Sequence, residues 1–114
     1  MTSREISSYW VASAVNSSTR VARLPAGFEL THFQHQRMRQ DGAAAAHMVY
    51  SDGLATVSVY VEQLSAAGDA FSGLSTMGAV NAYGLQLDGH QVTVVGEVPP
   101  VTVEMIARSV ERQS

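Results

Sequence analysis

Apolar and polar positions alternate most regularly between residues 44 and 62, where the chain reads AAAHMVYSDGLATVSVYVE. Two runs rich in valine and aromatic residues flank the dipeptide Asp52-Gly53. This dipeptide suits a two-residue type I′ turn, because both central residues of that turn need a positive φ. The segment therefore predicts a β-hairpin in which Tyr50 faces Ala55 and Met48 faces Val57.

The predicted hairpin has one apolar face and one mixed face, because cross-strand partners lie on the same side of a sheet. The apolar face consists of Ala44, Ala46, Met48, Tyr50, Ala55, Val57, Val59 and Val61. The mixed face consists of Ala45, His47, Val49, Ser51, Leu54, Thr56, Ser58, Tyr60 and Glu62. Since several aliphatic and aromatic groups belong to the mixed face, we expect it to be only partly solvated.

A second hairpin is predicted around Asp88-Gly89 by the same rule. Its cross-strand pairs would be Leu87 with His90, Leu85 with Val92, Tyr83 with Val94 and Asn81 with Gly96. This register places the aliphatic and aromatic residues of both strands on one face. Between the two hairpins, residues 63–77 change in composition to Ser, Ala, Gly and Asp, which predicts an irregular segment.

An earlier strand is indicated by the alternation in residues 28–32, after a turn at Pro25-Ala26-Gly27. Phe33 has the opposite phase to the preceding apolar positions. We therefore expect either a bulge near His32-Phe33 or a strand that is buried on both faces. Gln40-Asp41-Gly42 would end this strand.

The C-terminal residues predict a helix from about Val103 to Arg112, with Thr102 as its N-cap. Pro99-Pro100 would end the preceding strand, because proline cannot continue a ladder of hydrogen bonds. The helical spacing i, i+3, i+4, i+7 is occupied by Val103, Ile106, Ala107 and Val110. The predicted fold class is therefore α+β: an antiparallel sheet of about five strands, including the two Asp-Gly hairpins, with a C-terminal amphipathic helix on one face.

Composition narrows the classes of function. The 114 residues suffice for one domain, and with 46% hydrophobic and only 15% charged residues the chain is expected to fold. The net charge of −3 and the absence of lysine argue against binding to nucleic acid. The absence of cysteine excludes disulfides, thiol chemistry and cysteine-based zinc sites. No apolar run approaches the roughly 20 residues of a membrane span, and the first residues do not resemble a signal peptide, so the composition alone suggests a cytosolic protein.

Four segments carry a family resemblance, and they occur in a fixed order. They are LPAGF at residues 24–28, HMVYSDGLATVSVYVE at 47–62, GAVNAYG at 78–84 and HQVTVVGEVPP at 90–100. Together they resemble the C-terminal domain of the RseB/MucB family, the periplasmic negative regulators of the envelope-stress sigma factor. The resemblance covers roughly Thr19 to Val110, which is most of the chain.

The resemblance implies a location that the composition does not. Members of the family are exported proteins of two domains, and their larger N-terminal domain resembles lipoprotein-carrier half-barrels. We therefore expect a parent protein in the periplasm, of which this chain is a C-terminal fragment without signal peptide and with an added Met1. Residues 1–18 would be a remnant of the interdomain linker and residues 19–114 the domain itself. Trp10 would pack either on the missing domain or on this domain's own surface.

The resemblance also implies a function. The parent protein would bind the periplasmic domain of a membrane-anchored anti-sigma factor, protect it from proteolysis and release it when lipid or lipopolysaccharide is sensed. Because the lipid cavity is attributed mainly to the N-terminal lipid-sensing domain, this chain would contribute to anti-sigma binding, to interdomain packing and to self-association. Our candidate partner-binding residues are chosen by their chemistry near hairpin ends or on the mixed face, and they are Tyr50, Leu54, Tyr60, Tyr83 and His90.

Catalytic and metal-binding patterns were not found in the sequence, so we expect no cofactor and no enzymatic activity. On a strand, His32 and His35 would point to opposite sides, which is incompatible with a shared metal ion. Asp52 and Asp88 are explained as turn residues. Two other readings stay open: a stand-alone enzyme or small-ligand pocket that uses His47 or His90, and a structural module that only supports the N-terminal domain.

Overall fold

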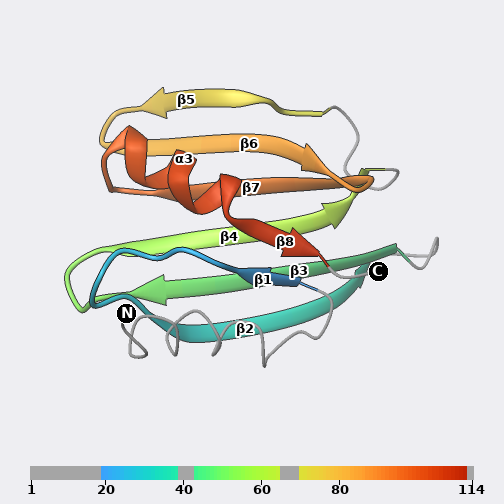
Figure 1. Ribbon diagram of the computed structural model, residues 1–114, viewed down its shortest axis with the longest axis horizontal. Helices are drawn as coiled ribbons and strands as arrows, with labels where there is room; N and C mark the ends of the chain where they lie inside the picture. Colours follow the sequence, from blue (N-terminus) through green and yellow to red (C-terminus); the bar gives the residue numbers. More distant parts are fainter. Residues whose placement is uncertain (1–18, 39–42, 65–69, 113–114) are drawn as a thin grey trace.

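The computed structural model describes residues 19–38, 43–64 and 70–112 of the chain (Figure 1). In chain order the elements are β1 (Thr19–Val21), β2 (Glu29–Met38), β3 (Ala43–Ser51), β4 (Thr56–Gln63), β5 (Gly73–Met77), β6 (Val80–Leu87), β7 (His90–Gly96), α3 (Pro100–Arg108) and β8 (Val110–Arg112). Residues 1–18, with Trp10 and the expected linker, lie outside the described residues. In the part of the chain that is described, no helix is long and apolar enough to cross a membrane.

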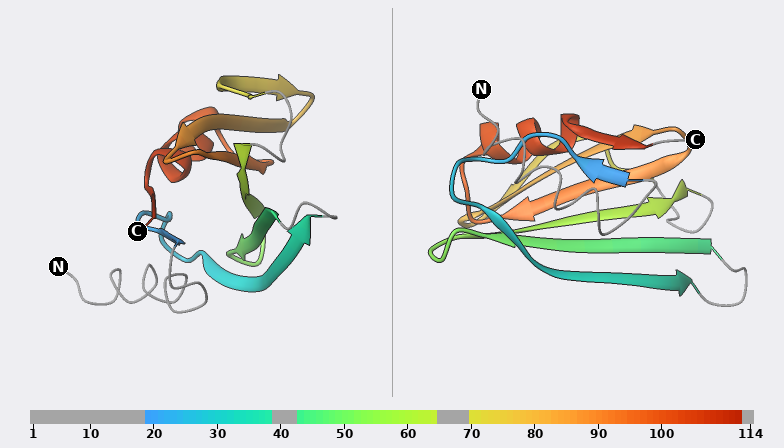
Figure 2. Two further views of the ribbon diagram at one scale, coloured as in Figure 1. Left: turned by 90° about the vertical axis from the view of Figure 1, so that its right-hand side faces the viewer. Right: turned by 60° about the horizontal axis from the view of Figure 1, so that its bottom comes forward.

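Six of the strands form one antiparallel sheet in the order β2-β3-β4-β7-β6-β5, and β1 pairs with β8 in a separate two-stranded sheet. α3, β1 and β8 lie on the same side of the large sheet (Figures 1 and 2). We call this side the covered face and the opposite side the open face. The α+β class with a C-terminal helix on one face of an antiparallel sheet is confirmed, with six strands in the sheet instead of about five.

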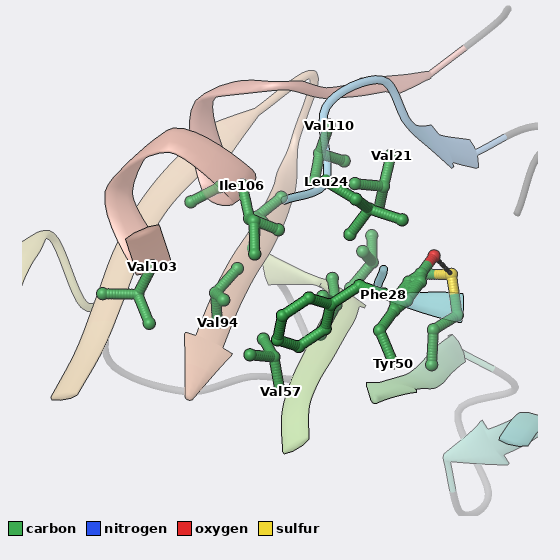
Figure 3. Close-up of a cluster of buried hydrophobic side chains, with 14 of the residues drawn as sticks. Val21, Leu24, Phe28, Tyr50, Val57, Val94, Val103, Ile106 and Val110 are labelled. Carbon is green, nitrogen blue, oxygen red and sulfur yellow. Dashed lines mark hydrogen bonds between the residues drawn. The ribbon is translucent and has the colours of Figure 1, made fainter. Parts of the chain in front are cut away.

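The hydrophobic core fills the space between the covered face and the layer formed by α3, β1 and β8 (Figure 3). Its fully buried members include Met48 and Tyr50 from β3, Val94 from β7 and Ile106 from α3. Val21 and Val110 join the core from the two short strands. Burial of this apolar surface provides the main driving force for the docking of the helix.

The first hairpin exists, but its predicted turn is wrong by one residue. Ser51 pairs with Thr56 and Tyr50 with Val57, so Gly53 and Leu54 are the central residues of the turn. Only Gly53 takes a positive φ, +96°, among the turn residues. Each residue of β3 therefore pairs with a residue two positions further along the chain than predicted. Because a shift by two keeps every side chain on its face, the apolar face keeps its members from the two strands. Leu54 and Ala55 leave the ladder and belong to the loop.

The side chain of Asp52 explains the displaced turn. Its Oδ1 accepts hydrogen bonds from the backbone N–H groups of Leu54, at 2.9 Å, and Ala55, at 2.8 Å. Ser51 Oγ accepts a third from the N–H of Gly53 at 3.0 Å. The aspartate therefore caps the loop from its first position and does not occupy the centre of a type I′ turn.

The second hairpin confirms the prediction in full. Leu87 pairs with His90 and Tyr83 with Val94, as expected from the sequence. Asp88 and Gly89 have φ values of +51° and +75°, so both central residues are in the left-handed region that a type I′ turn requires.

The outer strands of the sheet are β2 and β5, and only β2 was predicted from the sequence. The bulge expected near His32-Phe33 is confirmed, because the register between β2 and β3 skips a residue between Leu30 and His32. β5, in contrast, was predicted to be irregular and is a strand that pairs with β6. Four of its five residues are exposed, so its sequence had no buried face to reveal as a pattern.

The helix begins and ends earlier than predicted. α3 starts at Pro100, and Pro99 occupies the N-cap position without a side-chain hydrogen bond, so the assignment of Thr102 as N-cap is wrong. Proline suits the first turn, because its missing N–H would have no helical partner there. The buried stripe of Val103, Ile106 and Ala107 is confirmed. Val110 is buried as well, but it belongs to β8 and pairs with Val21.

Candidate functional site

The five candidate residues do not converge on one site. Tyr50 and Tyr83 lie on the covered face, and Tyr60 lies on the open face. Leu54 is in the loop between β3 and β4, whereas His90 begins β7 at the opposite end of the sheet. Some of the five therefore pack inside the domain, whereas others lie where a partner can reach them.

Tyr50 is a core residue. Its side chain is fully buried beside Phe28, and its hydroxyl donates a hydrogen bond of 3.5 Å to the sulfur of Met48 (Figure 3). Burial raises the pKa of the phenol well above its ordinary value of 10.0. In this fold the ring of Tyr50 does not reach the surface, so we remove it from the partner-binding set.

Tyr83 ties the helix to the sheet. Its hydroxyl accepts a hydrogen bond of 2.8 Å from Nη2 of Arg108, whose guanidinium carbon lies 5.5 Å from the centre of the ring. Arg108 also pairs with Glu104 one turn earlier, with 2.8 Å between Nε and Oε2. The hydrogen bond to Glu104 and the contact with Tyr83 raise the pKa of Arg108, but solvent screens these exposed charges.

The open face carries a group of three rings, His32, His47 and Tyr60, which we call the imidazole–tyrosine patch. His47 and Tyr60 are cross-strand partners on β3 and β4, and their rings stack with centroids 4.2 Å apart and planes inclined by 8°. His32 approaches His47 edge-on, with ring centroids 6.1 Å apart. Tyr60 stays 36% exposed and His32 is exposed as well, so both rings of the patch can be reached from solvent.

His47 has an unusual environment for a surface-facing residue. Its Nε2 atom is buried and has no hydrogen-bond partner among the described residues. Burial, and secondarily the neighbouring His32, lower the pKa of His47 below 6.5. The imidazole is therefore neutral at pH 7 and behaves as part of an aromatic stack.

The half-solvated character expected for this face is confirmed. His47 and Val49 on β3, and Ser58 on β4, are half-buried, whereas Thr56 and Tyr60 are exposed. Leu54 is 98% exposed at the tip of the loop. His90 is half-buried, and its Nδ1 lies 2.9 Å from the backbone oxygen of Asp88 within its own hairpin.

A contact that sequence reasoning missed covers part of the open face near β6 and β7. The ring of Phe71 lies against Gly84, and a Cβ at position 84 would collide with it. Gln91 fixes the backbone of Phe71 by accepting from its N–H at 3.0 Å and donating to its oxygen at 2.8 Å. Gln86 donates to the same oxygen at 2.9 Å. A glycine inside a strand and a buried glutamine in an apolar strand were the signals for this contact.

The histidines expected to be unsuited to a shared metal ion can be placed within residues 19–38, 43–64 and 70–112. No group of three or more His, Asp or Glu residues could hold a metal ion there. Positions 32 and 35 pair with Val49 and Ala46, which belong to opposite faces, as predicted. The ring of His47 is stacked on Tyr60, and its buried Nε2 has no hydrogen-bond partner among the described residues.

Comparison with known proteins gives a consistent result. Residues 13–111 match the family described as the MucB/RseB C-terminal domain. Among curated proteins, the chain is 42% identical over 95 residues to the sigma factor AlgU regulatory protein MucB of Pseudomonas aeruginosa. That alignment covers 80% of this chain and 30% of MucB, so the chain spans less than a third of the length of this relative.

Solved structures show the same fold at similar identity. A crystal structure of MucB in complex with MucA(peri) superposes with a TM-score of 0.67 at 36% identity, covering 85% of this chain and 37% of the other. The Pseudomonas aeruginosa MucA/MucB complex gives a TM-score of 0.68 at 35% identity, with coverage of 85% and 35%. MucB alone gives 0.60 at 38% identity, with coverage of 84% and 33%.

Proposed function

Because the chain belongs to the MucB/RseB C-terminal domain family, we propose that it is a non-enzymatic binding domain of a periplasmic sigma-factor regulator. In this proposal it helps to bind the periplasmic region of a membrane-anchored anti-sigma factor and to protect that region from proteolysis. The observation that carries the proposal is that two related structures, at 35% and 36% identity, contain MucB in complex with MucA.

The open face is the better candidate for the contact. The covered face is filled by α3, β1 and β8, whose apolar side chains are buried against it. The open face presents the imidazole–tyrosine patch, in which Tyr60 combines an accessible ring with a rigid stack beneath it. Aromatic side chains that are held in place in this way are typical anchors of protein interfaces.

The same face could serve more than one protein contact in the parent regulator. We propose that it meets the anti-sigma segment, while its neighbouring surface contributes to packing against the N-terminal lipid-sensing domain or to self-association. The neutral His47 supports a binding role, since an uncharged imidazole costs less to bury under a partner than an imidazolium.

The experiment is a binding titration of this chain, and of a full-length regulator that contains it, with the periplasmic region of MucA. Tyr60→Asp places a charge on the open face of β4 and should weaken binding at least about tenfold. Gln63→Asp is the matched control. Residue 63 is exposed on the same strand and pairs with His90, and by the alternation of side chains it belongs to the face opposite to that of Tyr60. Absence of binding by both wild-type proteins would contradict the proposed function.

A further inference from the structure

A hollow of about 390 Å³ opens beside the loop between β3 and β4. It is lined by Leu54 and Ala55 of the loop, Thr56 at the start of β4, Val80 at the start of β6, and Val95, Gly96 and Glu97 at and just after the end of β7. The volume is large enough for a short piece of polypeptide, and the lining combines aliphatic side chains with polar groups in about equal share.

Two strongly exposed apolar side chains flank this hollow. Leu54 is 98% exposed on the loop side, and Met77, which pairs with Val80 across β5 and β6, is 80% exposed on the other side. The backbone that carries Leu54 is fixed, because Asp52 and Ser51 bind three consecutive N–H groups of the loop. Leu54 is therefore presented to solvent by a held backbone, and exposed apolar groups around a concavity are typical of an interaction site.

The charge of the hollow indicates the chemistry of its occupant. Glu97 is the ionisable residue among those that line the hollow, and it is exposed. A hollow that combines the aliphatic side chains of Leu54, Val80 and Val95 with one carboxylate complements an apolar side chain that has a cation beside it. A second copy of this chain fits less well, because its net charge is −3 and its own hollow has the same acidic rim.

We propose that this hollow seats a segment of the anti-sigma partner in which an apolar side chain stands next to a lysine or arginine. This inference rests on the proposed function and adds to it the chemistry of the bound segment. Thr56 and Tyr60 are on the same strand and the same face, four residues apart, which is about 13 Å along a strand. One extended segment can therefore contact Tyr60 and the hollow together.

The test measures the dissociation constant of the MucA periplasmic region with variants of this chain. Leu54→Ser and Met77→Ser should each weaken binding at least about tenfold, because each removes an apolar contact that only a partner buries. Val101→Ser is the matched control, since Val101 is 71% exposed but lies on α3, outside the hollow. Thermal unfolding of each variant shows whether its fold is kept.

A charge exchange tests the second half of the proposal. Glu97→Lys should weaken binding of the wild-type probe. Among probes in which a single lysine or arginine is replaced by glutamate, one should bind the Glu97→Lys variant more tightly than the wild-type probe does, without binding the wild-type chain more tightly. If the wild type binds and the three hollow variants bind equally well, the hollow proposal is overturned while the proposed function stands. If the wild type does not bind the probe, both are overturned.

Discussion

Gly84 lies directly under the ring of Phe71, at a separation that leaves no room for a side chain on the strand. This contact predicts that Gly84→Ala destabilises the domain by about 1–3 kcal/mol, because the added methyl displaces the ring and strains the hydrogen bonds of Gln86 and Gln91. Urea denaturation measures the change. In a Phe71→Ala background the same substitution should cost far less, and equal costs in both backgrounds would refute the contact.

Docking of the helix depends on Ile106. Since its side chain is fully buried, Ile106→Ala should lower the free energy of unfolding by roughly 2–5 kcal/mol. Val101→Ala, in the same helix at a position 71% exposed, should change it by less than about 0.5 kcal/mol. Similar small effects at both positions in a denaturant titration would mean that α3 is not packed on the sheet.

The capping of the β3–β4 loop by Asp52 makes the stability of the domain depend on pH. Hydrogen bonds from the N–H groups of Ala55 and Leu54 lower the pKa of Asp52 below its ordinary value of 3.8. The stabilisation from the ionised form is therefore complete above pH 3.8 and is lost as the pH falls through the lower pKa of the folded state. Melting curves of wild type and Asp52→Asn between pH 6 and about pH 2 should converge at the acid end. A constant difference would contradict the role of the carboxylate.

His47 is a base and Asp52 is an acid, but the contribution of each to stability falls as the pH is lowered. Because its pKa is lowered from 6.5, the unfolded chain takes up a proton at a higher pH than the folded domain does. Stability from this residue is therefore complete above pH 6.5 and declines as the pH falls towards the pKa of the folded state. Titration by nuclear magnetic resonance should give a value below 6.5 that rises in His32→Gln. A pKa at or above 6.5 in the wild type would contradict the burial of the His47 imidazole in this fold.

The two Asp-Gly hairpins show where sequence reasoning succeeded and where it failed. Asp88-Gly89 forms the predicted turn, whereas Asp52 uses its side chain to cap the loop and moves the turn to Gly53-Leu54. The dipeptide signal cannot distinguish these two uses of an aspartate. The faces were still predicted correctly, since a shift by two residues preserves the alternation of side chains.

Features that depend on distant segments were not predictable. Val110 continues the helical spacing of α3, but its pairing with Val21 draws it into β8, so tertiary contacts override the local pattern. β5 was missed because an exposed edge strand has no buried side. The hollow joins a loop, β6 and β7, and no local pattern encodes such a neighbourhood.

The pairing of β1 with β8 has a mechanical consequence. Thr19 is opposite Arg112 and Val21 is opposite Val110, so the two ends of the described domain leave from the same end of one antiparallel ladder. A pulling force applied between these ends opens the pairs one after another, as in a zipper, and does not shear them all at once. Tension from flanking polypeptide would therefore peel away the two short strands first and loosen the layer over the sheet before the six-stranded sheet itself bears load.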